Sequence, residues 1–136
     1  MDDVEFEAQK TRIKPVIDVW IKRLGLRWWR RIDIEYHRDG HALSGMGHPG
    51  AAAVTHVHWE YKDAEVYFDV SKAAGFNDDD LEYMVVHELM HIFLQQVVTA
   101  FVDDNTMTGI QGEHVERTAT ELAQAFIWVR DFERDS

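Results

Sequence analysis

Two histidines and a glutamate are spaced along one stretch of the chain in a way that can hold a metal ion and activate water. The stretch reads His87-Glu88-Leu89-Met90-His91. In an α-helix His87 and His91 lie only about 40° apart, so their imidazoles can converge on one ion. Glu88 projects near them but off that line, where it can hold a water in the open position of the metal. The pattern predicts catalytic Zn²⁺, which acidifies water, with Glu88 as general base.

The surroundings of this motif favour a metal over coincidence. The helix expected over residues 78–101 is apolar nearly all round, which is typical of a buried helix. From Val85 to Val102 the only ionisable side chains are those of the motif. Without partners, two histidines and a carboxylate would carry a large desolvation cost there. The alternative is two core histidines that are each satisfied by a hydrogen bond, and a metal removes the cost more directly.

A catalytic zinc of this type needs a third protein ligand. The chain has no cysteine, so a histidine or a carboxylate must supply it. The last expected helix, over residues 112–132, offers three carboxylates: Glu113, Glu116 and Glu121. Its apolar face is expected to centre near Val115, Leu122 and Phe126. Glu116 lies about 90° from that centre, at the border, and the other two point further out. We therefore expect Glu116 to be the ligand, with Glu113 as the main alternative and His114 as a fallback.

Apolar periodicity predicts the elements that must position these groups. In residue numbers they are a helix at 3–24, strands at 30–37, 52–61 and 64–70, and helices at 78–101 and 112–132. Pro15 predicts a kink or a break in the first helix. A glycine-rich loop is expected over 39–50, and Lys62-Asp63 lies at hairpin distance between the last two strands. The fold class is therefore α+β, with a mostly antiparallel three-stranded sheet.

Size and charge limit the classes of function. A chain of 136 residues predicts one domain, residues 1–136. A formal net charge of −11 argues against general nucleic-acid binding. The basic stretch Lys22–Arg31 is the only candidate for binding an anionic partner, and the alternative is that it is simply the end of a helix and the start of a strand. The acidic segment Met1–Glu5 does not read as a signal peptide, and no apolar run is long enough for a membrane span. We expect a cytoplasmic protein without membrane contact.

Two segments together carry a resemblance to a known family. His87–His91, followed by Glu116-Arg117-Thr118-Ala119-Thr120-Glu121-Leu122-Ala123, resembles the ImmA/IrrE-like metallopeptidases and related short gluzincins of phages and prophages. The last helix in that family opens with a ligand glutamate, followed by a small residue and an apolar–Ala pair. Glu116, Ala119, Leu122 and Ala123 fit this register, whereas Thr120 replaces a common asparagine.

The resemblance covers about residues 26–130 and implies a zincin-like fold with an N-terminal helix, a sheet, the HExxH helix and a ligand-bearing C-terminal helix. It implies Zn²⁺ held by His87, His91 and Glu116, and hydrolysis of a peptide or protein substrate with a narrow range. It also implies that the strand before the HExxH helix, 64–70, is a sheet edge that pairs with extended substrate. The alternative for that strand is an edge protected by the charges of Glu65 and Asp69.

Other histidines are weaker candidates. His56 and His58 share one face of a strand, where they can bind a second metal or simply be solvated. His41 and His48 fall in the glycine-rich loop, which can act as a lid, and His114 can stabilise an oxyanion.

Two other classes of function remain open. The first is a non-catalytic zinc-containing binding protein, for instance one that acts in phage or host interactions, although Glu88 then has no purpose. The second is an acidic protein that mimics DNA by its charge.

Overall fold

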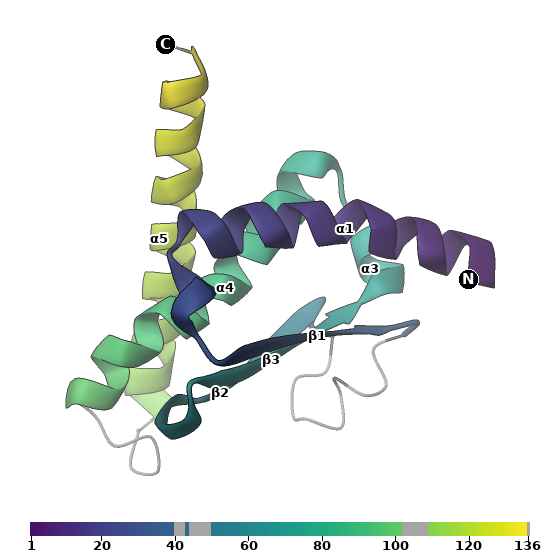
Figure 1. Cartoon of the computed structure of the whole chain (residues 1–136). Coiled ribbons are helices and arrows are strands. Elements are labelled where there is room, and N and C mark those ends of the chain that lie inside the picture. Colours follow the sequence, from purple (N-terminus) through teal and green to yellow (C-terminus); the bar gives the residue numbers. More distant parts are fainter. Residues whose placement is uncertain (40–42, 44–49, 102–108, 136) are drawn as a thin grey trace.

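The computed structural model describes residues 1–39, 43, 50–101 and 109–135, and of residues 96–101, 109–114 and 135 it describes the backbone alone. Within this part the order is α1 (Asp3–Arg23), η1 (Leu26–Trp28), β1 (Arg31–His37), β2 (Ala53–His58), η2 (Trp59–Tyr61), β3 (Asp63–Asp69), α3 (Val70–Ala74), α4 (Asp78–Phe101) and α5 (Gly109–Asp135). The protein is an α+β domain, as predicted. Figure 1 shows α1 lying across the sheet, with α5 at one end of the molecule.

Helix α1 begins at a side-chain cap and passes through a proline. The Asp2 carboxylate accepts a hydrogen bond from the backbone N–H of Glu5 at 2.8 Å. The helix continues past Pro15, so of the two predicted outcomes, a kink or a break, the break into two helices is wrong. Pro15 lies on the exposed side, while Ile13 and Ile17 are buried on either side of it. Packing of these residues outweighs the loss of one helical hydrogen bond.

The sheet is mixed, and its order is β1-β3-β2. β1 pairs with β3 in parallel, whereas β2 and β3 form an antiparallel pair joined through η2. The prediction of a mostly antiparallel sheet is therefore wrong, and so is the expectation that residues 64–70 form an edge. β3 lies in the centre with a neighbour on each side, Val70 already belongs to α3, and β1 and β2 are the outer strands. The predicted hairpin between β2 and β3 is confirmed. Lys62, with a left-handed backbone of φ 56°, lies in its turn.

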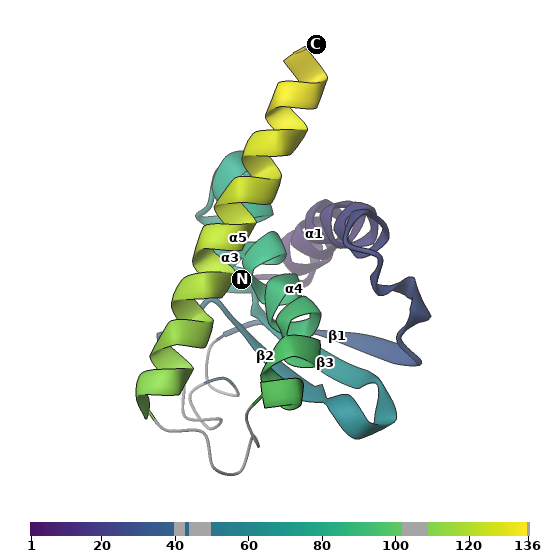
Figure 2. The ribbon, with the colours of Figure 1, turned by 90° about the vertical axis from the view of Figure 1, so that its left-hand side faces the viewer.

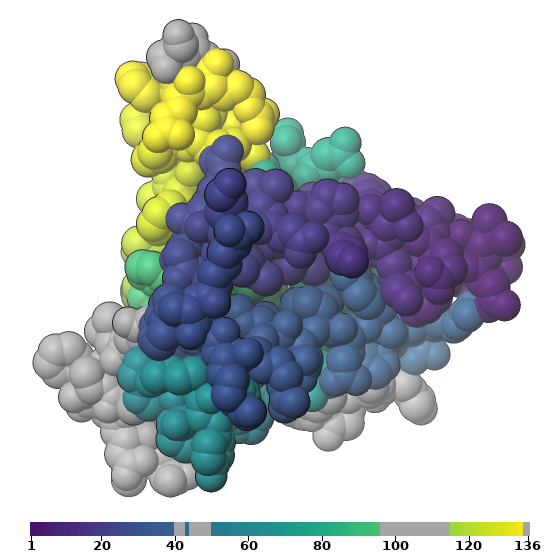
Figure 3. All heavy atoms as spheres, viewed as in Figure 1, coloured from purple at the N-terminus to yellow at the C-terminus, as the bar shows by residue number. Residues whose placement is uncertain are grey.

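One face of the sheet carries the core. Val66 and Phe68 of β3 point to it, are at most 1% exposed and belong to one buried cluster with residues of α1 and α4. Figure 3 shows α1 and β1 side by side across the middle of the molecule, seen from the same side as in Figure 1. The opposite face holds polar side chains at alternate positions, including Asp33 of β1 and Glu65 of β3, which are register partners. This alternation agrees with the predicted strand pattern.

Helix α4 occupies the middle of the molecule, which explains its apolar surface. It contacts β2, α1 and α5, so apolar residues are needed on several sides. Figure 2 shows α4 between α5 and the layer formed by α1 and the sheet. Its bounds, Asp78–Phe101, agree with the predicted 78–101. Helix α5 is longer than predicted, and its C-terminal end extends beyond the other helices (Figures 1 and 2). In the described residues, no helix combines the length and the apolar character that a membrane crossing needs.

Candidate metal centre

The start of α4 fixes which way its histidines point. The Asn77 side chain accepts a hydrogen bond from the backbone N–H of Asp80 at 2.8 Å, and acidic residues fill the first turn. Val86, Leu89 and Met90 are at most 1% exposed and pack into the core. His87 and His91 therefore lie together on the side of α4 that faces α5, with their ring centroids 5.0 Å apart.

One carboxylate of α5 bridges the two imidazoles. Glu116 Oε1 lies 2.6 Å from His87 Nε2, and Glu116 Oε2 lies 3.1 Å from His91 Nε2. Two zinc–ligand bonds of about 2.0–2.1 Å at a tetrahedral angle separate their donor atoms by roughly 3.3 Å. The two distances from Glu116 to the imidazole nitrogens, 2.6 and 3.1 Å, are thus close to the separation that ligands of one divalent cation require. Two imidazole nitrogens and a carboxylate oxygen also suit zinc by ligand type.

Glu116 points at α4 because of the face that α5 buries. Ala119 and Ala123 are fully buried, and Glu116 lies within about 60° of both around the helix. Their small side chains let the two helices approach. The predicted face centre was misplaced, because Leu122 and Phe126 are only partly buried. Glu116 therefore lies on the same side of α5 as Ala119 and Ala123, but its side chain is 60% exposed, as expected at the border of the contact face.

A polar contact further along α5 fixes its position against the core. Arg130, 8% exposed, donates to the Glu82 carboxylate of α4, and the other oxygen of that carboxylate accepts from Trp20 Nε1 at 2.9 Å. Three helices are joined at this point, because Trp20 belongs to α1. Arg130 is on the same side of α5 as Glu116, so this contact helps to hold the carboxylate towards the histidines.

Glu88 is held apart from Glu116. It is 7% exposed, and its Oε2 accepts a hydrogen bond from the Thr55 hydroxyl of β2 at 2.7 Å. A donor atom of Glu88 lies within 4.8 Å of those of His87 and His91, so the carboxylate is near the centre without joining the Glu116 contact. A cavity of about 230 Å³ opens between β2 and the carboxylates of Glu88 and Glu116. There is room there for water and for part of a substrate.

The charges of His87, His91 and Glu116, called the trio below, depend on one another. Hydrogen bonding to His91 lowers the pKa of Glu116 to about 2, against an opposing effect of partial burial, and the nearby His87 contributes further. Burial acts to lower the pKa of His91, but the hydrogen bond to Glu116 and the charges of Glu88 and Glu116 raise it overall. Without a metal, Glu116 is therefore an anion that favours a protonated His91.

His87 also has a partner behind it. Its Nδ1 lies 3.3 Å from the Thr120 hydroxyl, one turn along α5 from Glu116. When Nε2 presents its lone pair to an ion, Nδ1 carries the proton and donates to Thr120. Such a contact fixes the orientation and the tautomer of the ring.

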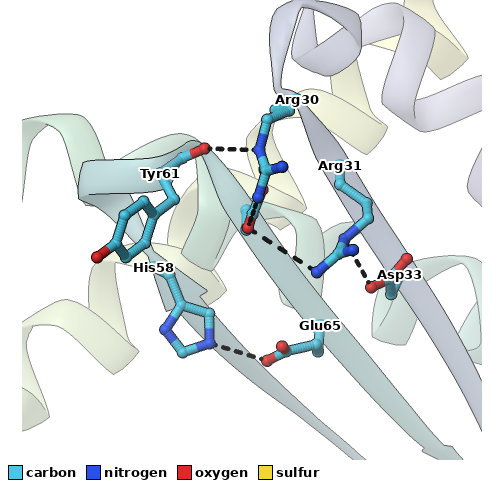
Figure 4. Close-up of polar contacts among 7 residues, drawn as sticks. Arg30, Arg31, Asp33, His58, Tyr61 and Glu65 are labelled. Atoms are coloured by element: carbon cyan, nitrogen blue, oxygen red, sulfur yellow. Dashed lines mark hydrogen bonds and ion pairs between the residues drawn. The ribbon is translucent and has the colours of Figure 1, made fainter.

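The other predicted candidates fare differently. His58 Nε2 pairs with Glu65 Oε2 at 3.1 Å on the open face of the sheet (Figure 4), while His56 lies edge-on to Tyr67 with centroids 5.6 Å apart. Over the residues that the structure describes, metal-type donor atoms gather only around His87 and His91, with Glu88 within 4.8 Å of both and Glu116 in hydrogen-bond contact with both. Glu121 is exposed. The side chains of Glu113, His114, His41 and His48 lie outside the described ones.

Sequence reasoning missed the role of Thr55. By strand alternation Thr55 falls on the core face of β2, and a hydroxyl on that face needs a partner. The place of Thr55 on the core face indicates that its hydroxyl has a partner, but it does not identify Glu88 as that partner. Thr120 was noted as a departure from the family pattern, without its contact to His87.

No protein-family model matches the chain, and no match was found among curated proteins or solved structures. The resemblance to short gluzincins therefore stays a prediction.

Proposed function

We propose that the protein is a zinc-dependent metallopeptidase. In this proposal His87, His91 and Glu116 hold the metal, and Glu88 is the general base. The observation that carries the proposal is that the two carboxylates make different contacts beside one cavity. Glu116 contacts both imidazoles, whereas Glu88 accepts a hydrogen bond from Thr55 and, within the described part of the chain, is hydrogen-bonded to neither Glu116 nor the imidazoles. A carboxylate such as Glu88, which lies beside the metal site without being a ligand, can act as a general base in catalysis but has no role in a purely structural metal site.

The residues fit a divalent cation, and each has a defined task. When bound, the cation supplies Lewis acidity that polarises a carbonyl and lowers the pKa of water. The Thr55 hydroxyl donates a hydrogen bond to Glu88 Oε2, and the other carboxylate oxygen can accept a proton in the cavity. Thr120 orients His87 from behind. Burial of Glu88 limits bulk water around the base.

β2 is the strand that would present a peptide to this centre. One of its edges pairs with β3, and in the described part of the chain no strand pairs with the other. Ala53, Val54 and Thr55 of this strand line the cavity beside Glu88. An extended peptide that added to the free edge would gain backbone hydrogen bonds and bring a carbonyl near the trio. The role first expected of 64–70 therefore passes to β2.

The test is a substitution of the base that leaves the metal ligands intact. We expect Glu88→Gln to retain zinc and to lose roughly 10²- to 10⁴-fold in peptide hydrolysis, the usual contribution of a general base. Hydrolysis of a peptide mixture would be followed by mass spectrometry, beside the metal content of each protein. Glu121→Gln, an exposed change on α5, is the matched control and should keep full activity.

Two results would contradict the proposal. Unchanged proteolysis in Glu88→Gln would remove Glu88 from the mechanism. One bound zinc in the wild type, with no peptide cleaved, would favour the alternative of a non-catalytic zinc-containing binding protein.

A further inference from the structure

A second, larger cavity opens on the other side of His87. Its volume is about 450 Å³, and it lies between α4, α5 and the segments before β2 and α4. His87 and Thr120 form the end next to the trio. Most of the exposed lining is apolar, and it includes the rings of Phe76 and Tyr83. The cavity therefore begins at a metal ligand and leads away from the cleft beside β2.

One carboxylate lies at the far end of this cavity. Asp80, in the first turn of α4, is among the lining residues. Asp80, Tyr83, Met84 and His87 follow one another along a single side of the helix at spacings of three, one and three residues. Seven residues of helix rise about 10 Å, so Asp80 is two turns away from His87. A side chain that enters beside His87 must be long to reach it.

These features match a cationic side chain with an apolar stem. Methylenes can pack on Met84 and the aromatic walls, and a guanidinium can stack on a ring face while it pairs with a carboxylate. Asp80 is exposed at the far end of the cavity, so a cationic group can reach it from the end of an apolar stem, whereas a purely apolar side chain would gain nothing from it. The net charge of −11 also attracts cationic peptides.

We propose that this cavity is a subsite for arginine, and less strongly for lysine, at the substrate position next to the bond that is cleaved. Its place beside that bond rests on the proposed peptidase function. The recognition of a guanidinium by Asp80, Phe76 and Tyr83 belongs to the cavity itself, so it can be measured without catalysis.

The first experiment measures binding alone. Nα-acetyl-arginine methylamide and its citrulline counterpart, a neutral isostere, would be titrated into the zinc-loaded Glu88→Gln protein and followed by NMR chemical shifts. We expect the arginine probe to bind about fivefold more tightly, from a part-exposed ion pair and a cation–π contact. Adding Asp80→Asn should reduce this ratio to about twofold or less. Adding Asp79→Asn, which removes an exposed carboxylate from the same turn that does not line the cavity, should leave it unchanged.

The second experiment places arginine, citrulline or leucine beside the scissile bond of otherwise identical peptides. Faster cleavage after arginine or before it, lost in Asp80→Asn alone, would support the subsite. Equal binding of the two probes by the unsubstituted cavity, or an arginine preference that survives Asp80→Asn, would overturn it. If the binding preference follows Asp80 but no peptide is cleaved, the proposed function fails and the guanidinium site stands as a binding site.

Discussion

Among the described residues, one histidine pair on α4 and one on β2 each have a carboxylate nearby, yet only the α4 pair shares it. On α4, His91 lies 3.1 Å from Glu116, and on the sheet His58 lies 3.1 Å from Glu65 (Figure 4). The difference is the second histidine. His87 reaches the same carboxylate at 2.6 Å, whereas His56 lies against Tyr67 instead. A His–carboxylate distance therefore says little by itself about metal binding.

The backbone explains this difference. Residues four apart on a helix lie one above the other, and α5 packs across them, so one side chain can meet both rings. Residues two apart on a strand are separated by about 6.5 Å, and here the side chains of His56 and His58 contact different residues of β3, Tyr67 and Glu65. Exposure adds to the effect: the His58 side chain is 47% exposed and water can satisfy it, whereas that of His91 is 21% exposed.

The largest expected effect comes from breaking the α4 pair. His91→Ala or Glu116→Ala should weaken zinc affinity by more than the roughly 10- to 100-fold typical of an outer partner, because a direct ligand is lost. Zinc at about 100 times its dissociation constant should add about 2.7 kcal/mol to wild-type stability, or roughly 10 °C in Tm. Chelator competition and thermal melts would measure both. His58→Ala is the matched control, and an equal loss of zinc there would place the metal elsewhere.

The next largest effect is expected from Thr55, the hydrogen-bond partner of the proposed base Glu88. Thr55→Val keeps the shape of the side chain but removes the hydrogen bond to Glu88. A hydrogen bond to a charged group is worth about 1.5–3 kcal/mol, so kcat should fall roughly 10- to 100-fold, with little change in KM or metal content. Steady-state kinetics would show the split. Thr55→Ser, which retains the hydroxyl, should recover most of kcat, and failure to do so would indicate a packing defect.

These two sites also show how far the sequence could lead. The spacing of His87 and His91 is local, and the apolar character of α4 follows from its own residues, so both were predictable. Thr55 belongs to another element, and its contact with Glu88 depends on how β2 packs on α4. The parallel pairing of β1 with β3 joins strands separated by a long connection, and local patterns do not encode such pairing. Glu116 was predicted from its angle on α5, and the family register pointed to the same residue, although the centre of the apolar face was misplaced.

Thr120 should have a smaller effect on the metal than a direct ligand. Removing its hydroxyl in Thr120→Ala frees His87 Nδ1, and zinc affinity should fall by about 10-fold, at the lower end for an outer partner. Competition with a zinc-binding dye would measure it. Thr120→Ser should restore the affinity. A loss that persists in Thr120→Ser would mean that the methyl group and not the hydroxyl matters.

The metal-free trio should leave a signature in the pH dependence of stability. The folded-state pKa of Glu116 is about 2, below its ordinary value of 4.5, so its contribution is present above pH 4.5 and is lost as pH falls towards 2. The pKa of His91 is raised above 6.5, so its contribution is present below pH 6.5 and is lost as pH rises through the raised value. Metal-free protein should therefore gain most from the trio between about pH 4.5 and 6.5.

Zinc should reverse the dependence on the alkaline side, because it competes with the proton of His91. Stabilisation by zinc should grow as pH rises from 6 to 8, and urea unfolding with and without zinc would show it. In Glu116→Gln, the metal-free gain between pH 4.5 and 6.5 should disappear. If that gain persists in Glu116→Gln, the coupling between Glu116 and His91 is absent.

The smallest expected effect is the change in stability when the His58–Glu65 pair on the sheet is removed. His58→Ala removes the pair with Glu65, and an exposed ion pair is worth about 0–1 kcal/mol, so Tm should change by no more than a few degrees. Zinc affinity and peptide hydrolysis should not change at all. Glu65→Gln tests the same pair from the other strand and should give a similarly small shift. A large loss of stability in either variant would mean that the open face of the sheet is covered by a partner, since only burial would make this pair costly to break.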